Sequence, residues 1–539
     1  MRKKTAIILG LFFIILISIN SIAENKSGTL VNEVTRKVSD LYDLKKSEFS
    51  GMAYSIFNSQ GILHSEGFGT SSWLHGKIIA PDKSQFRFSS ISKLVTTVAV
   101  AQLVQSGVLS LNTSITDIQG VAFIDYLRKN ETPERLKKWS KIEIKHLLSH
   151  QAGISKDLPG ARIFWNSDSL LDNSYPSFKT FRRGLLKTEF IYPAGATEGA
   201  VKYSNLGMNL LARIIEGLNR ENLSFPQYVK KHIFSPPGMN RSAFNVSPQN
   251  HANLVTGYGT HQPGTGPLKI PHVFDVSSYD GSIGIAAPVN DMAKLGNQFL
   301  RATLFKKNLI FKSDTAIQQF LSPIPHNSFL SKSRVMASGP FWRFRPMNKH
   351  NAENLWLGFT GFGYAFESIL LMNPIYDFGI VLAINSTTSS TFYFWDAIVK
   401  ILESHRPVQV GQKTKNLTKD ARINIVNSEN DFQFNQIDRQ TVSREQLLKF
   451  EGTYHADNLY KGPTAEIKID EENGQFHLTF HGRKLIPRDI DTGKFRFEKG
   501  PDVLFNGEPA VFQMDPSGNV TSVVIAHVKE LKYVNGLKE

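Results

Sequence analysis

The chain has 539 residues, of which 62 are lysine or arginine and 47 are aspartate or glutamate, and it contains no cysteine. The lack of cysteine excludes a disulfide scaffold and a thiol enzyme, and the 41% hydrophobic content excludes a disordered or fibrous chain. The formal net charge of +15 is compatible with an anionic partner, but no nucleic-acid-binding motif or dense basic block accompanies it, so we predict no nucleic-acid partner.

The first 23 residues have the pattern of a secretory signal peptide. Arg2, Lys3 and Lys4 precede an apolar run from Ala6 to Ile17, and Ser21-Ile22-Ala23 supplies small residues at the two positions that a signal peptidase reads. We therefore predict that residues 1–23 are removed and that the protein is exported, either to the periplasm or out of the cell. Retention of this segment as a membrane anchor is the alternative. Cleavage would leave 59 basic against 47 acidic residues, a net charge of +12.

Residues 24–405 are predicted to form one large domain, because helical and strand patterns alternate there without a long structureless gap. No segment after the signal has the ~18 consecutive apolar residues of a membrane span. The domain is expected to begin with an amphipathic helix over Leu30–Leu44. Two strands, Gly51–Phe57 and Ile62–Phe68, should follow as a hairpin around Asn58-Ser-Gln-Gly61.

Ser90 and Lys93 form a candidate catalytic pair. They open a strongly apolar, and hence buried, helix that continues over Leu94–Val104 and should stop at Ser106-Gly107. Residues three apart share a helix face, so the hydroxyl and the amine can meet. Burial and the positive helix end disfavour an ammonium, so Lys93 could take the proton of Ser90 and leave a nucleophile. The alternative is a helix-capping serine followed by a lysine that extends to solvent.

Four stretches, in order along the chain, carry a family resemblance. They are Phe86–Lys93 with Val98–Leu111, Ile142–Ile154, Tyr192–Gly195 with Lys202–Glu216, and Ile233–Met239. The ordered set resembles the serine β-lactamase and penicillin-binding-protein superfamily, in its class C-like branch with esterases and D-Ala-D-Ala peptidases. The resemblance covers roughly Leu30–Glu403 and implies an α+β fold, in which an antiparallel sheet flanked by helices is joined to an all-helical subdomain. It also implies a Ser90 nucleophile and no metal or organic cofactor.

Tyr203-Ser-Asn205 matches the Tyr-x-Asn element of this family. The match implies that Tyr203 shares the proton of Ser90 with Lys93 and passes it to the leaving group, provided that nearby cations lower the pKa of the phenol. It also implies that Asn205 hydrogen-bonds Lys93 and a carbonyl group of the substrate. From the residues alone, a buried tyrosine at a helix start with Asn205 as the helix cap is the alternative.

The third family element matches Leu357-Gly-Phe-Thr-Gly-Phe-Gly363, with Phe359 at the place where the branch has lysine or histidine. A phenyl ring supplies neither a charge nor a conventional donor, so recognition of a substrate carboxylate is in doubt. Thr360 and Gly361 are retained as substrate-binding positions, and the backbone N–H groups of Ser90 and Phe362 would form the oxyanion hole. We predict weak or no β-lactamase activity and a preference for esters or amides that lack the carboxylate.

Other motifs are given structural roles. His146 and His150 are four residues apart and could bind a metal on one helix face, but no acidic residue completes a hydrolase site, so we expect packing or hydrogen bonding. Asp280-Gly-Ser-Ile-Gly284 is similar to the glycine-rich segment of the family and otherwise indicates a loop and a helix cap. The Gly-x-Ser-x-Gly motif of α/β-hydrolases is absent from the sequence.

The end of the large domain should return to its beginning. Apolar strands over Ser368–Met372 and Phe378–Ile384 and a helix over Thr391–Glu403 predict one sheet assembled from both ends of the domain. Residues 406–445 are polar and are interpreted as a linker. Residues 446–539 show short alternating strands, which predict a small barrel or sandwich; the strands are Glu466–Ile469, Phe476–Phe480, Val511–Met514 and Val520–Ile525. The family resemblance implies the barrel, similar to the lipocalin-like modules of some relatives.

Two functions are compatible with these features. The leading interpretation is an exported serine hydrolase that acts through an acyl-enzyme on an ester or amide of a small molecule or peptide. The alternative is a catalytically weakened family member that serves as a binding or assembly protein on the cell envelope. Phe359, the extra β domain and a net charge suited to anionic peptidoglycan or lipid favour the alternative.

Overall fold

The computed structural model describes residues 28–73, 76–159, 177–191, 193–195, 203–244, 252–262, 266–269, 276–304, 307–311, 335–337, 342–344, 356–363, 366–374, 376–386, 390–404, 442–455, 465–472, 475–480, 483–491, 493–497, 509–525 and 529–535. The predicted signal peptide lies outside these residues, as do residues 406–441 of the predicted linker. Among the described helices, none is both long and apolar enough to cross a bilayer.

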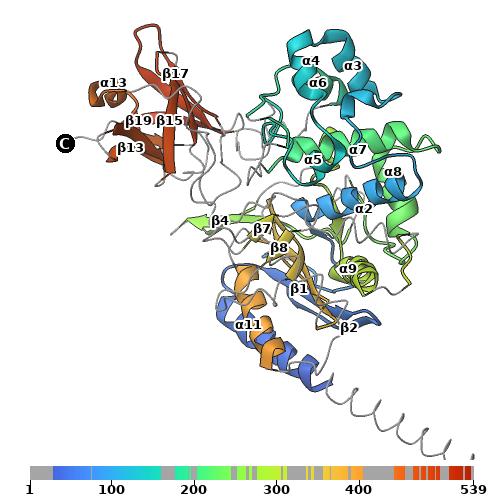
Figure 1. The fold of residues 1–539 in the computed structure, drawn as a ribbon. Helices are drawn as coiled ribbons and strands as arrows, with labels where there is room; N and C mark the ends of the chain where they lie inside the picture. Colours follow the sequence, from blue (N-terminus) through green and yellow to red (C-terminus); the bar gives the residue numbers. More distant parts are fainter. Residues whose placement is uncertain are drawn as a thin grey trace, which may run out of the picture.

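An antiparallel sheet lies at the centre of the first part of the chain (Figure 1). Its described strands lie in the order β2-β1-β11-β10-β9-β8-β7, and β1 pairs with β11 although more than 300 residues separate them. The predicted α+β class, with one sheet built from both ends of the domain, is confirmed. The strands are β1 (Gly51–Asn58), β2 (Gly61–Gly69), β7 (Val335–Ala337), β8 (Trp342–Phe344), β9 (Trp356–Gly363), β10 (Phe366–Asn373) and β11 (Phe378–Ile384).

Helices cover both faces of this sheet. Helix α9 (Val289–Thr303) packs on β1, β10 and β11, while α11 (Ser390–Ser404) packs on β10 and β11. Figure 1 shows α9 on one face and α11, beside the helix over 28–45, on the other. Nearly every residue of β1, β10 and β11 is therefore buried, which explains why these strands are largely apolar and do not alternate.

A helical region adjoins the sheet and is centred on α2 and α7 (Figure 1). Helix α2 is apolar on almost all sides and is buried accordingly. It ends as predicted, because Gly107 adopts a φ of 71° and the N–H of Val108 bonds back to the carbonyl of Leu103. The helices are α2 (Ser92–Gln105), α3 (Ala122–Asn130), α4 (Pro133–Trp139), α5 (Ile144–Leu148), α6 (Phe178–Leu185), α7 (Asn205–Leu218) and α8 (Phe225–Val229), the last continued by a π-helical turn over Lys230–Phe234.

Short pieces of structure connect the sheet and the helical region. Strand β3 (Phe86–Arg87) pairs with β6 (Ala286–Ala287), and β4 (Tyr258–Gln262) pairs with β5 (Gly266–Lys269). Three 3-10 turns are η1 (Ser89–Ile91), η2 (Ile115–Asp117) and η5 (Ser277–Tyr279). The β3–β6 pair brings the segment before α2 next to the segment before α9, and this proximity positions the candidate site.

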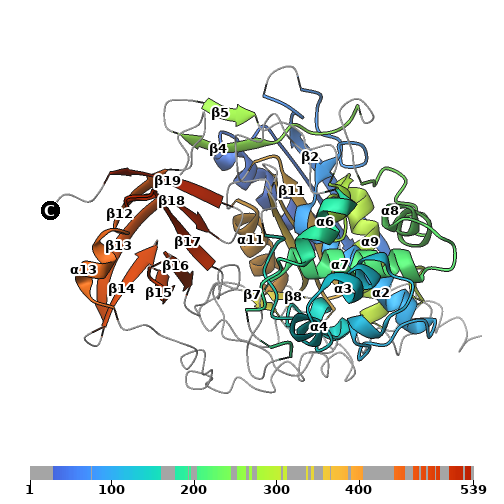
Figure 2. The same cartoon turned by 90° about the horizontal axis from the view of Figure 1, so that it is seen from above.

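The C-terminal strands form a separate unit with its own apolar core (Figure 2). The described strands pair in sequence order, and β12 also pairs with β19, which closes the sheet on itself. The strands are β12 (Gly452–His455), β13 (Ala465–Glu472), β14 (Gln475–Phe480), β15 (Arg483–Asp489), β16 (Lys494–Phe497), β17 (Pro509–Met514), β18 (Val520–Ile525) and β19 (Lys529–Asn535). Helix α13 (Arg444–Leu448) begins inside the predicted linker, because Ser443 and Gln446 form a reciprocal cap that the sequence analysis overlooked.

Glu367 is a buried carboxyl group on the α11 side of the sheet. It is 5% exposed, its Oε1 accepts a hydrogen bond from the hydroxyl of Thr391 on α11, and its Oε2 has no hydrogen-bond partner among the described residues. Burial raises the pKa of this carboxyl to about 7, against a lowering contribution from the Thr391 hydrogen bonds. Near neutral pH the group therefore changes charge inside the core.

This shift makes a prediction about stability. A carboxyl whose pKa is raised on folding contributes stability below its unfolded value of 4.5, and this contribution is lost as pH rises through about 7. We expect the free energy of unfolding to fall by about 3 kcal/mol between pH 5 and pH 8 from this group. Glu367→Gln imitates the protonated form and should lack that fall. Denaturant titrations of both proteins at several pH values measure the difference, and identical pH profiles would contradict the assignment.

Candidate active site

Ser90 is presented by the 3-10 turn η1, immediately before α2. The prediction that Ser90 opens the α-helix itself is wrong, because α2 begins at Ser92. Ser89 adopts a φ of 42°, which is unusual for a residue other than glycine, and its hydroxyl donates to the carbonyl of Gly363 at 3.2 Å. The N–H of Ile285 donates to the Ser92 hydroxyl at 3.1 Å. The turn is thus held from both sides, and Ser90 remains partly exposed.

Lys93 lies one turn beyond Ser90, with its amine inside the protein. Its Nζ donates to the Ser90 hydroxyl at 3.0 Å and to the carbonyl oxygen of Ser282 at 2.8 Å. The side chain is 1% exposed, and this burial lowers the pKa of the amine well below its ordinary 10.5. Asp157 opposes the shift and Lys156 adds to it. The result is a lysine that can exist as a neutral amine in contact with a hydroxyl.

Tyr203 approaches Ser90 from the other side. Its hydroxyl is 2.7 Å from the Ser90 hydroxyl, and its ring centroid is 4.8 Å from the Lys93 amine. Burial raises the pKa of this phenol, the hydrogen bond with Ser90 lowers it by less, and Asp157 raises it further. The condition for a base role of Tyr203, that nearby cations lower the pKa of its phenol, is therefore not met. The raised pKa favours a protonated Tyr203, so of the two groups that contact the Ser90 hydroxyl Lys93 is the one whose pKa is lowered.

Asn205 is the first residue of α7, and among the described residues its side chain makes no hydrogen bond with Lys93 or with the helix N-terminus. Its Nδ2 donates to the Asp157 carboxylate at 3.0 Å, so the predicted bond with Lys93 is wrong. The Asp157 carboxylate is a strong acceptor for the amide N–H, and the Lys93 amine donates to Ser90 and Ser282 instead of to the amide oxygen. The alternative role as helix cap is also wrong, because Ser204 accepts the N–H of Gly207 at 2.9 Å.

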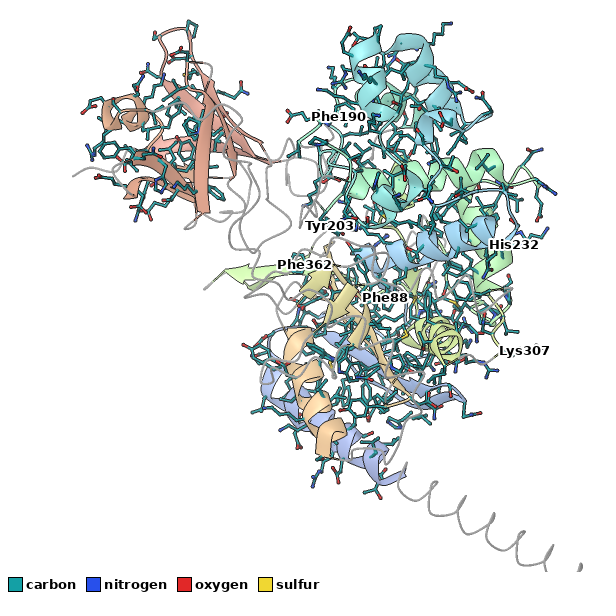
Figure 3. All side chains as sticks on the ribbon, viewed as in Figure 1. Phe88, Phe190, Tyr203, His232, Lys307 and Phe362 are labelled. Carbon is teal, nitrogen blue, oxygen red and sulfur yellow. The ribbon has the colours of Figure 1, made fainter. Side chains whose placement is uncertain are left out.

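Strand β9 runs beside the Ser90 turn. A Cβ atom at Gly361 would lie 2.2 Å from the carbonyl oxygen of Phe88, so only glycine allows this approach. Phe359 is 2% exposed, and its ring centroid is 6.0 Å from the Lys93 amine, at the position where the resemblance expects a cation. By strand alternation Thr360 and Phe362 face the opposite side, and Phe362 is 52% exposed. In Figure 3, Tyr203, Phe88 and Phe362 all lie where the helical region meets the sheet.

The two histidines are used in hydrogen bonds, as expected. Nδ1 of His146 accepts the N–H of Glu143 at 3.1 Å, and Nδ1 of His150 accepts the N–H of Ser204 at 3.1 Å. The His150 ring also packs against Tyr203, with centroids 4.8 Å apart. His150 therefore supports the segment that carries Tyr203. In the described part of the chain, no group of three or more histidine or acidic side chains is arranged to hold a metal ion.

Two groups at the site were not predicted from the sequence. Asp157 is 3% exposed, holds Asn205 and acts on the pKa of both Lys93 and Tyr203. The sequence feature that could have indicated Asp157 is its position as an acidic residue just after the family stretch Ile142–Ile154. The second group is the backbone carbonyl of Ser282, which lies inside the glycine-rich segment and fixes the Lys93 amine. A carbonyl acceptor leaves no signal in a sequence.

The fold and this arrangement of serine, lysine and tyrosine agree with the class of protein that the sequence resembles. The family model for Beta-lactamase matches residues 34–402, so the chain belongs to the beta-lactamase family. Proteins of this superfamily are serine hydrolases.

Comparison with individual proteins supports the same fold. The chain is 23% identical over 358 residues to Protein flp of Staphylococcus aureus (strain MW2), a match that covers 66% of this chain and 64% of the relative. It thus spans less than two thirds of that relative's length. The crystal structure of SurE matches 94% of this chain and 100% of its own, with a TM-score of 0.56 at 17% identity. The octameric penicillin-binding protein homologue from Pyrococcus abyssi matches 93% and 100%, with a TM-score of 0.54 at 18% identity.

Proposed function

We propose that the protein is an exported serine hydrolase of the class C-like branch that cleaves a carboxylic ester or amide through an acyl-enzyme. The supporting observation is the position of the Ser90 hydroxyl, 3.0 Å from the buried Lys93 amine and 2.7 Å from the Tyr203 hydroxyl. A nucleophile in hydrogen-bond contact with a base, which is itself oriented by a third group, is the arrangement that acyl transfer requires. Here the third group is the carbonyl of Ser282.

The environment of each group supports a distinct role for it. Lys93, whose pKa is lowered by burial, accepts the proton of Ser90 as the serine oxygen bonds to the substrate carbonyl carbon. Tyr203, whose pKa is raised by burial, remains protonated and can give its proton to the departing oxygen or nitrogen. When water attacks the acyl-enzyme, Tyr203 takes a proton from that water, and the Lys93 ammonium returns its proton to the Ser90 oxygen as the acyl group leaves, which restores all three groups. The negative carbonyl oxygen would be bound by the backbone N–H groups of Ser90 and Phe362.

The residue at position 359 limits the substrate. A buried phenyl ring beside Lys93 offers no charge to a substrate carboxylate. Substrates without that carboxylate are therefore favoured over β-lactams and D-Ala-D-Ala peptides. Gly361 and Thr360 would still contact the substrate from β9, Thr360 through its backbone because its side chain faces the other side of the strand. The lipocalin-like assignment of residues 446–539 and the domain boundaries at 405 and 445 also remain proposals.

Covalent labelling tests the proposed nucleophile. A fluorophosphonate probe should modify the protein with one equivalent, and trypsin should release the label on the peptide Phe88–Lys93. That peptide contains Ser89, Ser90 and Ser92, so fragmentation must assign the label to Ser90. The same preparation is then given a short-chain activated ester, a β-lactam and a D-Ala-D-Ala peptide. Turnover of the ester alone is expected. Absence of labelling and turnover, with sedimentation on peptidoglycan, would favour the envelope-binding alternative.

A further inference from the structure

A cavity of about 480 Å³ lies beside α8, the helix at the outer edge of the helical region in Figure 2. Its walls come from the turn before β3, from α8 with the π-helical turn that follows it, and from the segments 240–244 and 252–253. Ser90, Lys93 and Tyr203 are not among the residues that line it. The volume falls within the range of roughly 300–1,000 Å³ that is typical of small-molecule sites. The cavity is therefore a candidate for a second binding site.

Gln85 joins the walls of this cavity. Its Nε2 donates to the backbone carbonyl of Arg241 at 2.6 Å, and its backbone N–H donates to the carbonyl of Asn253 at 2.8 Å. The side chain of Gln85 is almost fully buried. Ala243 in turn exchanges two backbone hydrogen bonds with Ala286 of β6. The walls are thus held by the protein itself, and a preformed site lowers the cost of binding.

The charged side chains that line the cavity are all positive. They are Lys83, Lys230 and Arg241, and the described lining contains no aspartate or glutamate. All three side chains are exposed, and none forms an ion pair with a described residue. Asp291 accepts the backbone N–H of Arg241 at 2.9 Å, but its carboxylate already pairs with Lys294 at 2.9 Å. The cavity therefore carries an uncompensated positive charge, which favours an anionic ligand.

The same cavity has an apolar part. The rings of Phe234 and Phe244 stack with centroids 6.0 Å apart, and both residues line the cavity. Pro226, Ala243 and Ala252 also belong to the lining. An inorganic anion would fill little of this space and would leave the apolar surface in water, since one water molecule takes up only about 30 Å³. A ligand that combines negative charge with an apolar group would use both parts.

We propose that this cavity binds a phosphate monoester that carries an aromatic or alkyl group. A phosphate monoester has a charge of about −2 and three acceptor oxygens, which lysine and arginine side chains bind. The three cations supply the donors, and the rings of Phe234 and Phe244 contact the apolar group. The proposal goes beyond the hydrolase function and does not rest on it, because binding at the cavity uses none of the groups that would act on an ester or amide.

Three probes separate the contributions of charge and apolar surface. Phenyl phosphate has both features, inorganic phosphate has only the charge, and benzyl alcohol has only the ring. Isothermal titration calorimetry with the full chain should show one phenyl phosphate per protein, with a dissociation constant at least about 10-fold lower than that of either other probe. Ser90→Ala should bind it as tightly as the wild type. Absence of phenyl phosphate binding, or equal affinity for phenyl phosphate and inorganic phosphate, would overturn the proposal.

Two double variants locate the binding. Lys230→Gln with Arg241→Gln removes two cations from the cavity and should raise the dissociation constant of phenyl phosphate by at least about 10-fold. Lys137→Gln with Lys138→Gln removes the same charge from exposed positions of α4 and should change it by less than about twofold. This control separates the cavity from a general attraction of anions to a basic protein.

A single substitution keeps the test available if the first double variant does not fold. Lys83→Gln changes one exposed side chain of the cavity and should raise the dissociation constant by at least about threefold. Equal losses of affinity in the cavity variants and in the α4 variant, or no loss in the cavity variants, would show that phenyl phosphate binds elsewhere and would reject the site.

Discussion

Replacement of Ser90 by alanine is expected to reduce ester turnover by about 10⁴-fold or more and to abolish labelling by fluorophosphonates. The substitution removes only the oxygen that lies between Lys93 and Tyr203 and leaves both of these groups in place. Since Ser90 is partly exposed, stability should change by less than about 1 kcal/mol. Steady-state kinetics with the short-chain activated ester, together with gel detection of the label, measure both effects.

Ser92→Ala is the matched control for this experiment. Ser92 belongs to the same segment, but its hydroxyl only accepts the N–H of Ile285. Its loss leaves a buried N–H without a partner and should cost about 1–3 kcal/mol of stability while labelling at Ser90 persists. If Ser90→Ala still hydrolysed the ester at a substantial rate, or if Ser92→Ala alone lost the label, Ser90 would not be the nucleophile.

Lys93→Met is expected to lower kcat/KM by about 10³-fold and at the same time to stabilise the protein. Methionine fills a similar volume but cannot accept a proton, so the Ser90 hydroxyl loses its base. It also removes a buried amine whose desolvation opposes folding. Opposite changes in activity and stability are expected for a residue that is retained for chemistry. Lys137→Met, at an exposed position of α4, should change neither quantity appreciably.

The pH dependence of stability shows whether Lys93→Met loses activity because a neutral base is removed or because the fold is disturbed. A lysine whose pKa is lowered by folding binds fewer protons in the folded protein than in the unfolded chain, so its destabilising effect decreases as pH rises toward 10.5. The free energy of unfolding of the wild type should therefore rise over this window relative to Lys93→Met. Parallel profiles for the two proteins, or an activity above a tenth of the wild-type value, would show that Lys93 is not the neutral base.

The strands and the first catalytic contact could be predicted because each depends on neighbours along the chain. The predicted hairpin appears as β1 and β2, and the apolar runs near position 380 appear as β10 and β11. The contact between Ser90 and Lys93 follows from a spacing of three residues, which brings the two side chains together in one helical turn whether that turn is 3-10 or α. The geometry of a single helical turn is therefore sufficient to predict this contact.

Only the tertiary structure decided which groups meet across long stretches of chain and what charge they carry. Tyr203 reaches Ser90 across 113 residues, and the raised pKa of its phenol reflects burial that no local pattern encodes. The partner of Asn205 is Asp157 and not Lys93 for the same reason, since packing places the Asp157 carboxylate at the amide N–H and directs the Lys93 amine to Ser90 and Ser282. Sequence thus determined the residue types and the contacts within a turn, whereas packing determined distance, burial and hence protonation.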